Sequence, residues 1–195
     1  MAERSITNTY ELLLIGGSAG SLEVLIELLP ALDKNLQLAI IIVLHRKTGE
    51  SMLTGLLNNK TTWPVKEAEE KEPVQNQKVY VAPPDYHLLV EADKTFSLDY
   101  SEKVHYSRPS IDVSFETVAE AYGAAVIAVL LSGANADGTE GLRMIKKAGG
   151  VTIVQDPREA SVAYMPQQAI DGTRTDYISD TKGIAAIVNR LCSGS

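Results

Sequence analysis

The sequence predicts an α/β fold, a doubly wound, mostly parallel sheet with helices on both faces and a small β-hairpin. Short runs of Leu, Ile and Val alternate along the chain with segments of helical periodicity, as in βαβ units. The runs are apolar at every position, which is typical of strands buried on both faces of a parallel sheet. With 195 residues, of which 45% are hydrophobic, the chain is long enough for one sizeable core.

Five apolar runs are the predicted strands of the parallel sheet. Two shorter runs between residues 88 and 100 flank Asp93-Lys94-Thr95, and this spacing predicts the hairpin. The five runs cover residues 12–15, 38–44, 79–82, 125–131 and 151–154.

Four helices are predicted between and after these strands. The first has Ser21 as its expected N-cap and should end at Leu29, before Pro30. The second follows Pro109-Ser110, the third ends at Gly149-Gly150, and the last covers residues 182–191. The apolar stripes that predict the first three helices are Leu22, Leu25, Ile26 and Leu29; Ile111, Phe115, Val118, Ala119 and Tyr122; and Leu142, Ile145 and Ala148.

Composition and charge exclude several function classes. The net charge of −7 leaves no basic footprint for nucleic acid. No apolar run approaches the roughly 20 residues of a membrane-spanning helix, and the first ten residues lack the apolar core of a secretory signal. The single cysteine, Cys192, cannot close a disulfide within the chain. We therefore expect a cytoplasmic protein without membrane insertion, with residues 1–195 as one domain and residues 1–9 as a flexible N-terminus.

Three polar side chains follow predicted strands, where ligands bind in such sheets. Ser18 follows the first strand, His45 the second and Asp137 the strand over residues 125–131. Gly16-x-Ser18-x-Gly20 matches the nucleophile elbow of serine hydrolases, and the Ala19 N–H at the following helix start is an oxyanion donor candidate. His45 would take the serine proton, and Asp137 would orient the imidazole.

Each of these features has an alternative interpretation. The loop over residues 16–21 could be a plain tight turn or a phosphate cradle, His45 could mark the end of a strand, and Asp137 could cap a helix. Asp156 competes with Asp137 as the residue that orients the histidine. His87 and His105 are expected on the surface or on the substrate side. Three scattered histidines and one cysteine give no metal-ligand spacing, so we expect no metal and no cofactor.

Several segments resemble the catalytic domain of the CheB-type chemotaxis protein-glutamate methylesterases. The family's serine, histidine and aspartate fall on Ser18, His45 and Asp137. The resemblance implies a doubly wound serine hydrolase that removes methyl esters from glutamate side chains of chemoreceptors, and that in some members deamidates glutamines. The segments are IGGSAGSLEVL (15–25), VLH (43–45), VYVAPPDYHLLV (79–90), RPSIDVSFETVA (108–119), LLSGANADGTEGLRMIKKAGG (130–150) and YMPQQAI (164–170).

The same resemblance implies partners and further site residues. The implied partner of this chain is the methylated cytoplasmic region of chemoreceptors. A receptor methyltransferase is a second candidate, because Ser18-Ala19-Gly20 resembles the variant found in proteins that fuse the esterase to such a methyltransferase. The backbone N–H of Ala134, beside that of Ala19, would complete the oxyanion hole. Arg108, Tyr164 and Met165 are candidates for the substrate groove.

Two residues of the loop before Asp137 depart from the family's pattern and leave an alternative open. Ala134 and Asn135 replace a methionine and a glycine, and we expect backbone strain if position 135 needs a positive φ. The alternative that these two replacements leave open is a weakened family member that acts as a receptor- or methyltransferase-binding module. The receiver domain that family members usually carry is not found in this sequence, so we expect either a stand-alone esterase or one domain of a longer protein.

Overall fold

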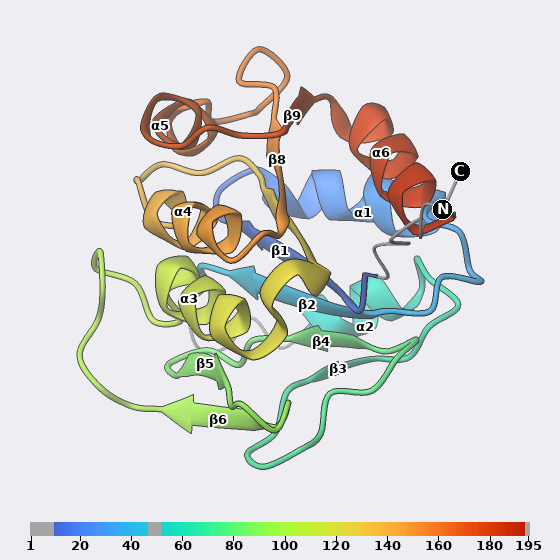
Figure 1. Cartoon of the computed structure of the whole chain (residues 1–195), viewed down its shortest axis with the longest axis vertical. Helices are drawn as coiled ribbons and strands as arrows, with labels where there is room; N and C mark the ends of the chain where they lie inside the picture. Colours follow the sequence, from blue (N-terminus) through green and yellow to red (C-terminus); the bar gives the residue numbers. More distant parts are fainter. Residues whose placement is uncertain (1–9, 47–51, 194–195) are drawn as a thin grey trace, which may run out of the picture.

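A seven-stranded parallel sheet forms the centre of the molecule (Figure 1). The computed structural model describes residues 10–46 and 52–193. The strand order is β3-β4-β2-β1-β7-β8-β9, and every pairing is parallel. The predicted α/β fold is thus confirmed. The strands are β1 (Leu12–Gly17), β2 (Ala39–Leu44), β3 (Val65–Glu67), β4 (Val79–Val81), β7 (Val126–Leu130), β8 (Val151–Gln155) and β9 (Tyr177–Ser179).

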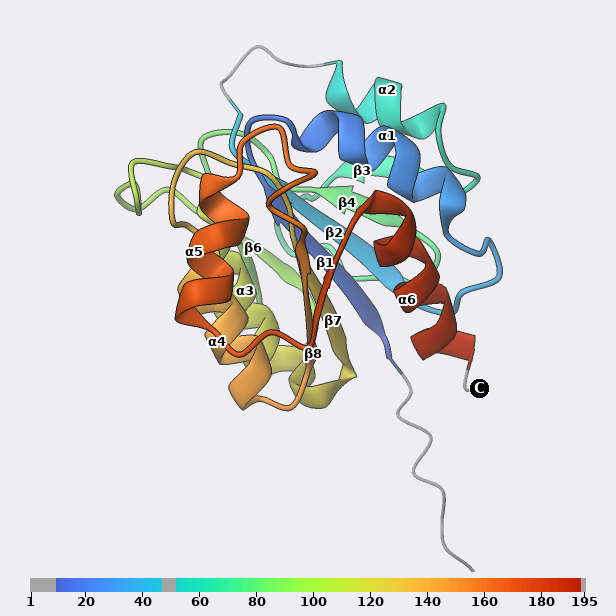
Figure 2. The ribbon, with the colours of Figure 1, turned by 90° about the horizontal axis from the view of Figure 1, so that it is seen from above.

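Helices cover both faces of this sheet (Figure 2). On one side α1 (Ser21–Ala31) packs against α6 (Thr181–Ser193), with the short α2 (Leu53–Asn58) beside α1. On the other side α3 (Ile111–Tyr122), α4 (Thr139–Lys147) and α5 (Tyr164–Gly172) pack side by side, in that order. None of the helices in the described part is long and apolar enough to cross a membrane.

The predicted hairpin is also confirmed. β5 (His87–Val90) and β6 (Phe96–Asp99) pair antiparallel as a separate two-stranded sheet, and β5 packs against α3. The Phe96 ring makes an edge contact with Tyr80 of β4 at 4.9 Å between ring centroids. The hairpin thereby extends the layer that α3 forms.

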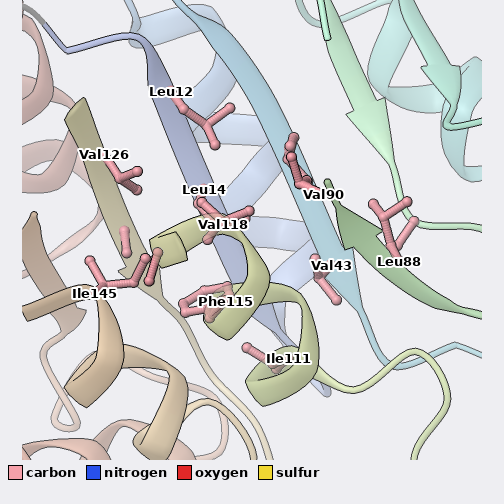
Figure 3. Packing of buried hydrophobic residues seen from close by; sticks show 14 of the residues in the cluster. Leu12, Leu14, Val43, Leu88, Val90, Ile111, Phe115, Val118, Val126 and Ile145 are labelled. Carbon is pink, nitrogen blue, oxygen red and sulfur yellow. The ribbon is translucent and has the colours of Figure 1, made fainter. Parts of the chain in front are cut away.

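Alternation along β1 divides the core into two layers. Leu12 and Leu14 pack with Phe115 and the other buried residues under α3 and α4 (Figure 3), whereas Leu13 and Ile15 pack on the side of α1 and α6. All four β1 side chains are fully buried, and each contributes about 1.5–3 kcal/mol by leaving water. β1 is therefore apolar on both faces, as its sequence predicts.

Several local predictions need correction. Ser21 is not the N-cap of α1: Gly20 holds that position with φ of 81°, and Ser21 is the first helical residue. The helix continues through Pro30 to Ala31. A proline in the last turn removes only one backbone hydrogen bond, at the end of the helix where the intrahelical hydrogen bonds stop. The predicted elements do not include α2, α5, β3 or β9, and these two strands have three residues each. The expected flexible N-terminus, residues 1–9, lies outside the described residues.

The topology creates a crevice at the carboxyl ends of the central strands. From β1 the chain moves to β2 on one side, and it later returns to β7 on the other side of β1. Such a reversal of strand order is the point at which open α/β sheets bind ligands.

Candidate active site

Ser18, His45 and Asp137 come from three neighbouring strands. In the register of the sheet Gly17 of β1 lies opposite Leu44 of β2, so Ser18 and His45 are the next residues on adjacent strands. The His45 N–H donates to the Gly17 carbonyl at 3.2 Å, which continues the pairing into the site. Ser18 and His45 line the same cavity, of about 490 Å³.

Serine side chains link the turn at Ser18 to the loop after β7. The Ser18 N–H donates to the Ser132 carbonyl at 2.8 Å and to Ser21 Oγ at 3.1 Å, and Ser21 Oγ donates to the same carbonyl. The left-handed backbone of this turn falls on Gly20, whereas Ser18 has no positive φ. A Cβ at position 20 would lie 2.5 Å from the Ser161 Cβ, so both the conformation and the packing require glycine there.

Asp137 is fully buried and contacts the imidazole directly. His45 Nε2 lies 2.7 Å from Asp137 Oδ2. The same carboxylate accepts the N–H groups of Ile111 at 2.7 Å and Asp112 at 2.9 Å, and the Ser110 hydroxyl at 3.0 Å. It therefore sits at the amino end of α3, where backbone N–H groups and the helix dipole favour a negative charge.

The electrostatic environment keeps this carboxylate ionised. Burial acts to raise the pKa of Asp137, but hydrogen bonds from His45 and from the Asp112 and Ile111 backbone more than offset it, so the pKa lies below its usual value. Asp137 is thus an anion held against the His45 ring.

The contact through Nε2 assigns roles to the two nitrogens of His45. With Nε2–H donating to Asp137, Nδ1 carries the lone pair and is the nitrogen that can accept a proton. In the best-studied triad the aspartate contacts Nδ1 instead. Among the described residues, Ser18 Oγ makes no hydrogen bond to His45, so only the histidine–aspartate half of the arrangement is formed.

A second carboxylate, Asp112, lies beside Asp137. Its Oδ1 accepts the N–H groups of Gly138 at 2.9 Å and Gly141 at 2.7 Å, and its Oδ2 lies 3.2 Å from His105 Nε2. Burial is the main cause that raises the pKa of Asp112 to about 6, and the nearby Asp137 charge adds to it. Asp112 is not among the site residues predicted from the sequence, although an acid in the first turn after a Pro-Ser pair is a signal for a helix start.

These groups also bear on metal binding. Ligand atoms of His105, Asp112 and Asp137 lie within 4.8 Å of one another. The two Asp137 oxygens already accept hydrogen bonds from His45, Ser110, Ile111 and Asp112, which occupies their lone pairs. The cluster is therefore poorly suited to a metal ion, and the expected absence of metal and cofactor stays a prediction.

The two proposed oxyanion donors have free N–H groups within the described part of the chain. Neither the Ala19 N–H nor the Ala134 N–H has a hydrogen-bond partner there. The strain expected at Asn135 is not found, because its φ is not positive. Instead, Asn135 Oδ1 accepts the Asp137 N–H at 3.1 Å and so helps to shape the loop.

The groove candidates have three different environments. Arg108 and His45 line a second cavity, of about 320 Å³, and the Arg108 guanidinium is held over the Tyr100 ring and against the Ser101 carbonyl at 2.7 Å. Tyr164 is about half exposed at the start of α5. Met165 is fully buried and packs against Gly133, so the expectation that its side chain lines an open groove is wrong.

The competing candidates lie elsewhere or have structural roles. Asp156 follows β8, two strands away from β1, and its pKa of about 2 reflects hydrogen bonds from Arg158. His87 is buried rather than on the surface: Nδ1 accepts the Ser110 N–H and Nε2 donates to the Glu102 carbonyl. His105 is half exposed and pairs with Asp112.

Known proteins are similar to this chain in both sequence and fold. The family model for CheB methylesterase matches residues 13–188. A crystal structure of the Thermotoga maritima CheB methylesterase catalytic domain superposes with a TM-score of 0.89 at 34% identity, over 94% of this chain and 99% of that one.

Curated relatives differ in length. A Leptospira interrogans protein, provisionally named a protein-glutamate methylesterase/protein-glutamine glutaminase, is 48% identical over 93% of this chain and 95% of its own length. The protein-glutamate methylesterase/protein-glutamine glutaminase of Thermotoga maritima is 36% identical over 86% of this chain, but only 50% of its own length is matched. The chain therefore spans nearly all of the first relative and half of the second.

Proposed function

The chain belongs to the CheB methylesterase family, and on this basis we propose that it hydrolyses methyl esters of glutamate side chains on chemoreceptors. Its relatives are named protein-glutamate methylesterases, and the family is therefore one of carboxylic ester hydrolases. The observation that carries the proposal is the 2.7 Å contact between His45 Nε2 and the buried Asp137, beside a cavity that Ser18 shares. No finding favours the binding-module alternative.

In the first half of the proposed reaction Ser18 Oγ attacks the ester carbonyl carbon. His45 Nδ1 accepts the serine proton, and Asp137 stabilises the resulting imidazolium. The negative charge that develops on the carbonyl oxygen is met by the N–H groups of Ala19 and Ala134. The C–O bond to the methoxy group then breaks, His45 returns the proton, and methanol leaves an acyl-serine.

Water completes the cycle. His45 takes a proton from the water, which attacks the acyl-serine, and the serine oxygen leaves with that proton, which gives a glutamate carboxyl group. The same steps with an amide substrate release ammonia, so glutamine deamidation needs no further group. This second activity is in the names of the relatives.

We also propose which partners bind at the site. The cavity that Arg108 shares with His45 is also lined by Lys103, Arg46 and Asp85. Three cations against one carboxylate beside the reacting centre suit a glutamate-rich receptor segment. The partner is then the methylated cytoplasmic region of chemoreceptors, which agrees with the expected cytoplasmic location. A receptor methyltransferase remains a candidate second partner.

A serine-directed phosphonate tests the nucleophile. We expect wild-type protein to gain one covalent adduct, which peptide mapping places on Ser18, whereas Ser18→Ala and Asp137→Asn react at least a hundredfold more slowly. Ser161→Ala is the matched control, because Ser161 lies near Gly20 but outside the proposed reaction, and it should label at the wild-type rate. A folded wild-type protein that gains no adduct would contradict the proposed mechanism.

A further inference from the structure

Two carboxylates connect the amino ends of α3 and α4 reciprocally. Asp137, in the loop before α4, accepts the N–H groups of Ile111 and Asp112 in the first turn of α3. Asp112, in that first turn, accepts the N–H groups of Gly138 and Gly141 at the start of α4. The start of α3 and the loop before α4 thus each supply a carboxylate that satisfies free N–H groups at the start of the other helix.

Hydrogen bonds to two side chains also hold the backbone at Asp137 and at the residue after it. Gly138, the next residue, donates to Asp112, and Asn135 holds the Asp137 N–H. Gly138 adopts φ of 99°, and a Cβ there would lie 2.5 Å from Leu130 Cδ1, so the backbone has little room to move. The bonds to Asp112 Oδ1 and to Asn135 Oδ1 are the side-chain contacts that hold this backbone in place.

We propose that Asp112 is a positioning residue for Asp137, acting through its hydrogen bonds to the Gly138 and Gly141 N–H groups. Asp112 Oδ1 faces α4 and Oδ2 faces His105, so its side chain reaches the reaction only through Asp137 and His45. The inference rests on the proposed function for its kinetic readout, but the His45–Asp137 contact that it concerns can be measured without turnover.

The two backbone N–H groups meet a single oxygen, Oδ1, and this makes two variants informative. Asp112→Asn keeps an oxygen for both bonds and removes the charge. Asp112→Ala removes both bonds, which leaves two buried donors unpaired and frees the loop that carries Asp137. The proposal therefore predicts that asparagine, but not alanine, preserves the site.

Asp176 provides a matched control at the opposite edge of the sheet. Its carboxylate likewise accepts a backbone N–H, that of Thr152 at 2.9 Å, near the amino end of β8. Asp176→Ala should lower thermal stability much as Asp112→Ala does. Because it lies far from the carboxyl ends of the strands, it should leave the reaction rate of the folded protein unchanged.

The experiment measures kcat and KM for methanol release from a methylated receptor fragment, with active sites counted by phosphonate labelling. We expect Asp112→Ala to lower kcat by 10- to 100-fold with KM changed less than twofold, since small misplacements of a reacting group cost on the order of 100-fold. Asp112→Asn should stay within threefold of wild type, and Asp176→Ala within twofold. If Asp112→Ala does not fold, Asp112→Glu replaces it, because its longer side chain displaces the accepting oxygen.

A second readout keeps this inference separate from the proposed function. The proton shared by His45 Nε2 and Asp137 should give a downfield NMR resonance in wild type, Asp112→Asn and Asp176→Ala, and lose it in Asp112→Ala. Absence of methanol release by wild type together with this pattern would contradict the esterase and support the positioning role. Wild-type kcat per active site in Asp112→Ala, or an Asp112→Asn protein as impaired as Asp112→Ala, would overturn the proposal.

Discussion

At the scale of single residues, the proposed mechanism depends on an anion at position 137. Asparagine there would present an amide NH₂ to donors that now meet a carboxylate, and the His45 ring would take the wrong tautomer. We expect Asp137→Asn to lower kcat by on the order of 10⁴, the loss known for this change in the best-studied triad. Methanol release with a saturating methylated substrate measures it.

Asp156→Asn is the control for that prediction. Asp156 also follows a strand of the sheet, but it pairs with Arg158 and not with His45. Its replacement should change kcat less than twofold. A loss below tenfold in Asp137→Asn, or a larger loss in Asp156→Asn, would mean that another group orients the histidine.

At the scale of elements, the turn from β1 into α1 places Ser18. Gly20→Ala combines a positive φ with a Cβ that has no room beside Ser161, so we expect a loss of several kcal/mol of unfolding free energy and of most activity. Gly123→Ala is matched in its positive φ of 56° but has open space around the added Cβ. It should cost about 1–3 kcal/mol without changing kcat. Urea unfolding and methanol release separate the two effects, and equal kcat losses in both would contradict the role of the turn.

The elements that the sequence predicted are those with strong local patterns. Residues 12–15 and 38–44 are apolar throughout and became central strands, and the stripe from Ile111 to Tyr122 became α3. β3 and β9 were missed because each is a three-residue edge strand with half-buried or exposed side chains, which gives no apolar run. α5 was missed because Pro166 interrupts its pattern, although proline is tolerated in a first turn.

At the scale of the whole molecule, topology decides which side chains meet. Ser18, His45 and Asp137 could be predicted together because each follows a buried strand, and parallel strands end at one edge. Asp112 and Ser110 could not, because they reach the site from the start of a helix whose position depends on tertiary packing. The burial of His87 and Met165 has the same cause, since neither has a local sequence signal.

The paired carboxylates also give the whole molecule a pH-dependent stability. The pKa of Asp112 is raised to about 6, so between about pH 4 and 7 the folded protein retains a proton that the unfolded chain releases. Stability from this group therefore falls as the pH rises through that window. The lowered pKa of Asp137 makes stability rise with pH instead. Asp137 is present in both wild type and Asp112→Asn, so a comparison of these two proteins reports on Asp112.

We therefore expect Asp112→Asn to be more stable than wild type at about pH 8, by on the order of 2 kcal/mol, and to match it near pH 4. Denaturant unfolding of both proteins across this range measures the difference. Stability curves that run parallel at all pH values would show that the Asp112 carboxyl titrates normally in the fold.

The central claim is that Ser18, activated by His45 and Asp137, hydrolyses glutamyl methyl esters. Its most direct test is methanol release from a methylated chemoreceptor fragment, measured for wild type beside Ser18→Ala, with circular dichroism to establish that both are folded. The account predicts steady release by wild type and none above background by Ser18→Ala. Equal release by both proteins, or none from folded wild type, would contradict it.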